Sequence, residues 1–296
     1  MRFLIEVTKQ QSMRRIILRR IFLTAALALL TNLPLFAMNV ELRPEKVIPG
    51  DVFLLRVQPD KSAAGNTPQA EFAGRKIGFY QDADNHFIAL VPVDIDTSPG
   101  KYPVTIKAGD EEKISHVNVG PHKFPTKKIT LPGEKVILSP EDLQRAGKEA
   151  ELLKNILSQT TSPEWDGRFK APMDTKVSET FGVKRIMNGK KTSVHGGLDY
   201  KGQMGAPVKA VNAGTVVLRD EFFFGGNTLV IDHGMGLFSV YMHLSEFKVS
   251  KDEKISKGHV IGLVGMTGRA TGPHLHFGFN LQGVRVNPAS LFKLKL

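Results

Sequence analysis

The sequence predicts an all-β protein in which two β-rich regions are joined by a short helical connector. Short runs rich in β-branched and aromatic residues fill residues 40–119 and most of the chain after residue 169, and glycine and proline turns separate them. Only one stretch between the two regions has clear helical features. A length of 296 residues with 41% hydrophobic content is enough for two domains, each with its own core.

The first 37 residues have the pattern of a secretory signal peptide. A basic segment, Arg14 to Arg20, precedes an apolar run that starts at Ile21 and ends at the small residue Ala37. Polar residues and Pro34 interrupt this run, so a retained membrane anchor is the less favoured alternative. We therefore expect residues 1–37 to be a signal peptide cleaved near Ala37, and the rest of the chain to be exported to the periplasm or cell envelope.

The charge and the cysteine content of the chain limit its partners and the kinds of bond and metal site that it can form. The formal net charge is +11, but residues 1–37 hold six Lys or Arg and one Glu, so a net charge of +6 remains after cleavage. The remaining chain has no arginine-rich run and no alternation of aromatic and basic residues, so we expect no nucleic-acid partner. Because the chain has no cysteine, disulfide bonds and thiolate metal sites are excluded.

Residues 38–121 contain the first group of predicted strands. The runs VFLLRVQ, HFIALVPV, KYPVTIKAG and KISHVNVG are short, and turn signals such as Pro49-Gly50 and Ser98-Pro99-Gly100 divide them. Strands at this spacing without a helical pattern are typical of an immunoglobulin-like sandwich. This region has no obvious cluster of ionisable side chains, so we expect it to be non-catalytic.

Residues 122–168 form the predicted connector, which includes a helix over residues 139–158. Ser139 is a suitable N-cap, Pro140 suits the first turn, and acidic residues follow. An apolar stripe with charged residues between its members follows, made of Leu143, Leu152, Leu153 and Ile156. After this helix, a polar segment leads into the second β region, residues 169–296.

Two histidines stand one residue apart in the run TGPHLHFGF, residues 271–279. In a β-strand, His274 and His276 would share one face, while Leu275, Phe277 and Phe279 would share the other. The pattern therefore predicts a strand with one face in the core and two metal-capable imidazoles on the opposite face. From these two residues alone, a purely structural role is the favoured interpretation.

Two other segments carry side chains of the same kind. The run SVHGGLDY places His195 and Asp199 four residues apart, and the glycines between them favour an extended segment on which both share a face. In SVYMHLS, alternation places Tyr241 and His243 on one face, and Met242 and Leu244 on the other. Two histidines and a carboxylate are a known catalytic zinc set, and further histidines would be available for proton transfer.

Neither a G-x-S-x-G nucleophile elbow nor an H-E-x-x-H helix occurs in the chain. Among other candidate residues, we expect His233 to be structural and His259 to be exposed. For Tyr241, stabilisation of an oxyanion and simple packing are both open. Residues 222–224, three phenylalanines, are expected to lie in the core or anchor a loop rather than form a wall of the site.

Residues 178–292 closely resemble the lysostaphin-type, or LytM-domain, zinc endopeptidases of bacterial cell walls. The resemblance rests on ETFGVKR, HGGLDY, GAPVKAVNAGTVV, GNTLVIDHG, YMHLS, KGHVIGLVGMTG and TGPHLHFGF. It implies that His195, Asp199 and His276 are ligands of Zn²⁺, and that His243 and His274 are the catalytic pair. It also implies that residues 169–296 form an antiparallel β peptidase domain that hydrolyses peptide cross-links of peptidoglycan.

Several alternatives stay open at this level. A non-catalytic envelope module of the same fold would bind wall peptides or activate an amidase, but it would not need all five matching positions, so catalysis is favoured. The resemblance does not decide whether glycine bridges or bonds to a D-amino-acid centre are cut, or whether His243 or His274 is the general base. The N-terminal region is expected to position substrate, dock an envelope protein partner, or cover the groove until it is released.

Overall fold

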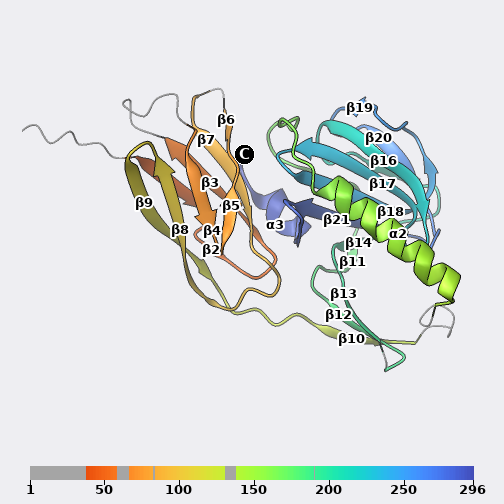
Figure 1. Cartoon of the computed structure of the whole chain (residues 1–296). Coiled ribbons are helices and arrows are strands. Elements are labelled where there is room, and N and C mark those ends of the chain that lie inside the picture. The colour runs from red at the N-terminus through yellow and green to blue at the C-terminus, as the bar shows by residue number, and fades with distance from the viewer. Residues whose placement is uncertain (1–37, 59–66, 83, 131–137, 190) are drawn as a thin grey trace, which may run out of the picture. The chain divides into compact units, whose positions relative to one another are not determined.

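The computed structural model describes residues 38–58, 67–82, 84–130, 138–189 and 191–296 (Figure 1). The predicted signal segment, residues 1–37, lies outside the described residues. Within the described residues, no helix combines the length and the apolar character needed to cross a membrane. The described chain is nearly all β, as the sequence predicts, with helices α2 and α3.

Two β-sheets form from the N-terminal strands. One has the order β1-β3-β7-β6, and the other has the order β2-β9-β8-β4-β5. Their bounds are β1 Asn39–Arg43, β2 Lys46–Val47, β3 Val52–Gln58, β4 Gln69–Phe72, β5 Arg75–Ile77, β6 Tyr80–Gln81, β7 Phe87–Pro92, β8 Gly100–Ala108 and β9 Glu111–Val119. The two sheets share one core, in which the rings of Phe53 and Phe72 meet edge to face at 5.2 Å. The immunoglobulin-like assignment of residues 38–121 stays a prediction.

Strands β3 and β7 are buried on both faces, which explains their continuous apolar runs. Phe53 and Leu55 point into the core between the two N-terminal sheets. Val52 and Leu54 belong instead to the largest core of the chain, together with C-terminal residues such as Leu291. The amide N–H of Val52 also donates to Ser290 Oγ at 3.1 Å. The N-terminal sheet therefore contributes one face to the C-terminal core.

The connector contributes a strand and a helix. Strand β10 (Thr126–Ile129) pairs in parallel with β12 (Lys184–Met187), which pairs in turn with β13 (Lys191–Val194). The predicted helix is present as α2 (Pro140–Leu157), and its N-cap Ser139 accepts a hydrogen bond from Asp142 N–H at 3.0 Å.

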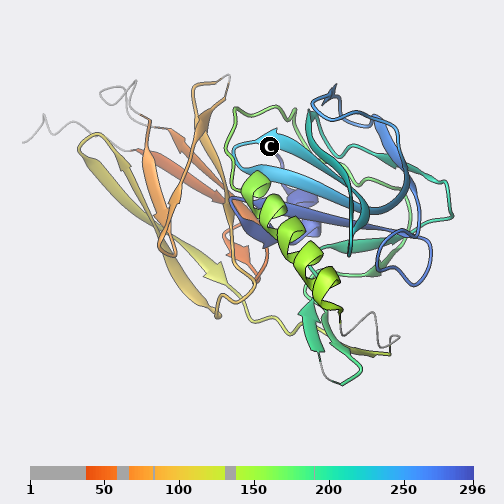
Figure 2. The ribbon, with the colours of Figure 1, turned by 45° about the vertical axis from the view of Figure 1, so that its right-hand side comes forward.

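Helix α2 lies across the C-terminal sheet (Figure 2). Leu153 and Ile156 pack on the cluster that includes Phe222 and Phe238. Leu143 and Leu152 are 64% and 43% exposed, so these two residues of the apolar stripe lie outside this contact. Nearer its N-terminus, α2 is attached by polar contacts instead: Arg145 Nη2 donates to the Glu221 carbonyl oxygen at 3.0 Å, and Glu149 Oε2 accepts from the Phe223 N–H at 2.7 Å.

The C-terminal strands form one large sheet with the order β11-β14-β21-β18-β17-β16-β19, in which β20 pairs with β15 and β18, and β22 pairs with β21. Their bounds are β11 Val177–Glu179, β14 Leu198–Lys201, β15 Pro207–Lys209, β16 Gly214–Phe222, β17 Gly226–Gly234, β18 Leu237–Phe247, β19 Lys254–Ile255, β20 Val260–Val264, β21 His274–Leu281 and β22 Val284–Val286. The short helix α3 (Pro288–Lys293) follows, and its Phe292 ring stacks on Phe277. Strands β14, β21 and β18 are direct neighbours, which places three segments distant in sequence side by side.

Candidate active site

Three neighbouring strands carry four of the five predicted site residues. Asp199 on β14 is the direct cross-strand partner of His276 on β21, and Lys201 is the partner of His274. On the other side of β21, Met242 of β18 faces His276, and His243 follows it. Leu275 and Phe277 are fully buried, so β21 has one face in the core and the other at the site, as the alternation predicts. His195 enters from the loop that precedes β14.

The three predicted metal ligands converge on one point. His195 Nε2 lies 2.9 Å from Asp199 Oδ1 and 3.0 Å from His276 Nδ1, and His276 Nδ1 lies 2.8 Å from Asp199 Oδ1. Gly197 makes this approach possible, because a Cβ there would lie 2.1 Å from the carbonyl oxygen of Phe277 and 3.1 Å from the His276 ring. Glycine is therefore needed at position 197 because the chain packs closely against β21 there.

The chemistry of these three atoms fits a bound cation. The Nδ1–H of His195 donates to the carbonyl oxygen of Thr180 at 2.8 Å, and a carbonyl can only accept. With its proton on Nδ1, the His195 ring turns the lone pair of Nε2 toward the carboxylate oxygen of Asp199. Two lone pairs at this distance repel unless a proton or a metal ion lies between them. Tetrahedral zinc holds N and O ligands at about 2.0–2.2 Å, so its ligands would need to separate by only roughly 0.5 Å.

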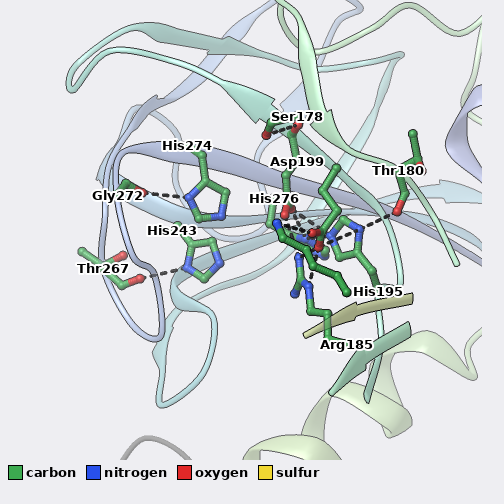
Figure 3. A network of polar contacts seen from close by, with 12 residues as sticks. Ser178, Thr180, Arg185, His195, Asp199, His243, Thr267, Gly272, His274 and His276 are labelled. Atoms are coloured by element: carbon green, nitrogen blue, oxygen red, sulfur yellow. Dashed lines mark hydrogen bonds and ion pairs between the residues drawn. The ribbon is translucent and has the colours of Figure 1, made fainter. Parts of the chain in front are cut away.

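A charged network, which the sequence analysis did not assign, holds the other side of Asp199 (Figure 3). Arg185 Nη2 donates to Asp199 Oδ2 at 2.8 Å, and the same guanidinium pairs with Glu179. Lys127 Nζ on β10 donates to Glu179 Oε1 at 3.0 Å. Arg185 therefore occupies the outer carboxylate oxygen, which leaves Oδ1 for the two histidines. The only sequence signal was the resemblance motif ETFGVKR, which contains Glu179 and Arg185.

Both carboxylates of this network stay ionised. Burial would raise the pKa of Asp199, but the close contacts of its Oδ1 with the His195 and His276 rings outweigh burial and lower that pKa well below its ordinary range. Burial also acts to raise the pKa of Glu179, and the hydrogen bond from Lys127 and the charge of Arg185 reverse the effect. The Asp199 carboxylate is therefore ionised, and available to a cation, at neutral pH.

His243 and His274 form a second group beside the first. Their ring centroids are 4.7 Å apart. His243 Nδ1 donates to the carbonyl oxygen of Thr267 at 2.9 Å, and His274 Nδ1 donates to that of Gly272 at 2.8 Å. In Figure 3 the other nitrogen of each ring faces the ligand cluster. Burial, followed by the nearby His274 ring, lowers the pKa of His243 to about 4, so its Nε2 is unprotonated at neutral pH.

His243 reaches this position through a β-bulge. The register between β17 and β18 shifts between Leu229↔Tyr241 and Asn227↔Leu244, and His243 has a φ of 64°. Leu244 consequently packs in the same core as Tyr241, whereas strict alternation predicts the opposite face, so that prediction is wrong after Met242. A left-handed non-glycine residue costs roughly 1–3 kcal/mol, and bulges of this kind re-aim side chains at functional sites.

A cleft of about 490 Å³ contains both groups. Besides His243, His274, His276 and Asp199, its lining includes Lys127, Glu179, Arg185, Lys201 and Arg269. His195 is behind these residues and only 2% exposed. The lining of the cleft is therefore strongly polar and includes both cationic side chains and imidazole rings.

Two other candidate residues are structural. Tyr241 is fully buried, and its hydroxyl accepts hydrogen bonds from Val211 N–H and Ser239 Oγ, so it packs in the core rather than facing the cleft. His233 lies in β17, fully buried, with contacts to the Ala213 carbonyl and Ser239 Oγ, as expected for a structural histidine.

His259 is exposed, as expected. Among the three phenylalanines at 222–224, Phe222 is in the core. The carbonyl oxygen of Phe224 accepts from the Arg269 N–H at 3.0 Å and so anchors the loop before β21. None of the three lines the cleft described above.

Comparison with known proteins gives a consistent result. Residues 193–288 match the model of peptidase family M23. The chain is 40% identical over 119 residues to the peptidoglycan DD-endopeptidase ShyA of Vibrio cholerae, and 37% identical over 117 residues to the DD-carboxypeptidase/endopeptidase Mpg of Neisseria meningitidis. These alignments cover 39% and 40% of this chain, but only 28% and 27% of the relatives.

A solved structure described as an M23 peptidase, from Pseudomonas aeruginosa, matches with a TM-score of 0.63 and 29% identity. The match covers 83% of this chain and 94% of the other, so the shared fold extends well beyond the C-terminal sheet. The family match includes all five predicted site residues and lies within the region whose motifs resemble LytM domains. This chain therefore carries a peptidase family M23 domain of the LytM type at residues 193–288.

Proposed function

We propose that this protein is a zinc-dependent endopeptidase that hydrolyses peptide cross-links of peptidoglycan in the bacterial cell envelope. The observation that carries the proposal is the convergence of His195 Nε2, Asp199 Oδ1 and His276 Nδ1 beside two further imidazoles in one cleft. Relatives over this region are named peptidoglycan DD-endopeptidases, which supports the same substrate class.

In this proposal His195, Asp199 and His276 hold the metal, and three protein ligands leave a position open for the reaction. When bound, zinc supplies Lewis-acid chemistry and makes water more acidic. His243 and His274 exchange protons at Nε2, one taking a proton from the attacking water and the other giving one to the departing amine. Each Nδ1 donates to a main-chain carbonyl, so the neutral form of each ring presents Nε2 as a proton acceptor, and the ring that serves the departing amine must enter that step protonated at Nε2.

We further propose that residues 1–37 are a signal peptide, 38–121 a non-catalytic β domain, 122–168 a connector and 169–296 the peptidase domain. The N-terminal domain would position wall peptides or dock an envelope protein. N-terminal sequencing of the exported protein should find a start near Met38. An intact Arg14–Ala37 segment in exported protein would favour a membrane anchor instead.

Digestion of purified peptidoglycan, with mass analysis of the released fragments, tests the function. Cross-linked fragments should be lost and uncross-linked peptides gained. A chelator should stop the reaction, and added zinc should restore it. Binding to peptidoglycan without any change in the fragments would instead indicate a non-catalytic module of the same fold.

A further inference from the structure

Two of the cations that line the cleft have no acidic partner. Arg185 is neutralised by Glu179 and Asp199, and Lys127 by Glu179. In the part of the chain that the structure describes, neither the Arg269 guanidinium nor the Lys201 ammonium forms an ion pair or a side-chain hydrogen bond. The cleft thus has an excess of positive charge that its own residues do not satisfy.

Arg269 is held in place by apolar and main-chain contacts. The guanidinium carbon of Arg269 lies 4.2 Å from the centroid of the Phe224 ring. The main-chain N–H of Arg269 donates to the Phe224 carbonyl oxygen at 3.0 Å. Its loop is braced where Gly268 crosses Gly226, since a Cβ on Gly268 would lie 2.2 Å from Gly226 N. The rigid attachment leaves the five N–H donors of the guanidinium free for a ligand.

The same loop positions the proton-transfer residues. Thr267 and Gly272, on either side of Arg269, supply the carbonyl oxygens that hold His243 and His274. Arg269 is therefore fixed relative to the reacting part of the cleft. Burial, and then the charge of Arg185, lower the pKa of Arg269, which indicates that its positive charge lies in a partly dehydrated, electropositive environment.

We propose that Arg269 binds a carboxylate of the peptide substrate close to the scissile bond, so that the cleft selects anionic peptides. A guanidinium pairs with a carboxylate through two parallel hydrogen bonds, which fixes the orientation of the peptide as well as its charge. Lys201, opposite His274 in the register, adds attraction without that geometry. This inference rests on the proposed function, because it defines the substrate of the same cleft.

Two cross-linked stem peptides test the proposal. The residue that supplies the nitrogen of the scissile amide carries a carboxyl group. This group is a free carboxylate in one peptide and a primary amide in the other, and the peptides are otherwise identical. Cleavage of both is measured with the full-length, zinc-loaded protein and with Arg269→Met, which keeps an apolar chain on Phe224. Binding is measured in a zinc-loaded His274→Ala background, with and without Arg269→Met, so that it does not depend on turnover.

For the wild type, the free carboxylate should raise kcat/KM and affinity about 10- to 100-fold over the amide. Arg269→Met should abolish this preference and leave the amide peptide within about threefold of wild type. The loss of kcat/KM caused by amidation of the peptide and the loss caused by Arg269→Met should therefore not add, which is the sign of a direct contact. Arg269→Lys should retain part of the preference.

Arg219→Met is the matched control, because Arg219 also lies over a phenylalanine, Phe247 at 4.7 Å, but does not line the cleft. It should behave as wild type. Equal losses on both peptides in Arg269→Met, or an unchanged preference, would overturn the proposal. If neither peptide is cleaved, the proposed function fails, while the binding measurements still decide whether Arg269 recognises a carboxylate.

Discussion

Two groups of histidines share one cleft but differ in their contacts. His195 and His276 each direct a nitrogen at the carboxylate of Asp199, which Arg185 holds from behind. His243 and His274 make no carboxylate contact within the described chain, and each is held only by a main-chain carbonyl. The two groups have the same residue type, so the contacts of each ring are what separate the proposed metal ligands from the proposed proton carriers.

The largest expected effect separates the two histidines of β21. His276→Ala removes a ligand nitrogen and should lose most of the bound zinc and nearly all activity. His274→Ala should keep zinc near one equivalent, because its Nδ1 is held by the Gly272 carbonyl and its ring lies beside His243 rather than against Asp199. Metal analysis of both purified variants decides the assignment, with the exposed His259→Ala as control. If His274→Ala is the variant without zinc, the roles of the pair are reversed.

The second prediction concerns the proton carriers. His243→Ala or His274→Ala should each lower turnover by roughly 10²–10⁴-fold, the usual range for general acid–base groups, without loss of zinc. The pKa of His243 is lowered to about 4, so its base form should persist down to mildly acidic pH. Turnover on a soluble cross-linked peptide is the measurement. Wild-type turnover in His243→Ala would remove that residue from the mechanism.

The third prediction tests the support of the ligand group. Arg185→Ala frees Asp199 to rotate and should weaken zinc binding by roughly 10- to 100-fold, as is typical for residues that orient a metal ligand. Competition with a chromophoric chelator measures the affinity, and Arg185→Lys should recover part of it. Tighter zinc binding in Arg185→Ala would mean that the arginine acts mainly by opposing the charge of the metal.

The smallest effect concerns His233, a buried histidine outside both groups. Burial lowers its pKa to about 4 in the folded protein, against about 6.5 when unfolded. Below pH 6.5 the unfolded chain takes up a proton that the folded protein does not, so the free energy of unfolding should fall as pH drops from 6.5 to about 4. The full contribution is about 3 kcal/mol.

Denaturant unfolding across this pH range measures the effect. His233→Gln, which keeps hydrogen-bonding groups without a titrating ring, should show a shallower loss of stability with falling pH. His259→Gln should retain the wild-type slope because this ring is exposed. Zinc content of folded His233→Gln should be unchanged. A wild-type slope in that variant would exclude His233 as the source.

Local patterns in the sequence were enough for much of the fold and the site. Alternation around His274 and His276 predicted the strand, its buried face and its polar face. The cap at Ser139 predicted the start of α2. These features depend on contacts between near neighbours in the chain, and therefore leave a direct record in residue order. The five site residues could also be named, because their motifs are short and contiguous.

Alternation failed where long-range packing overrode it. The bulge at His243 depends on the register of β18 against β17, and nothing in YMHLS marks it. The burial of Leu153 but not Leu143 depends on where α2 meets the sheet. Both features depend on contacts with distant parts of the chain, so neither can be predicted from the residues of its own segment.

The sequence by itself determined the β character of the chain, the connector helix and the residue types of the site. Only the tertiary structure decided how Lys127, Glu179 and Arg185 reach Asp199, and that Arg269 has no acidic partner among the residues that the structure describes. The physical reason is distance along the chain. Charges act through space, and Lys127 and Arg269, which are more than a hundred residues apart in the chain, are brought to one cleft by the pairing of strands such as β10 with β12 and β14 with β21.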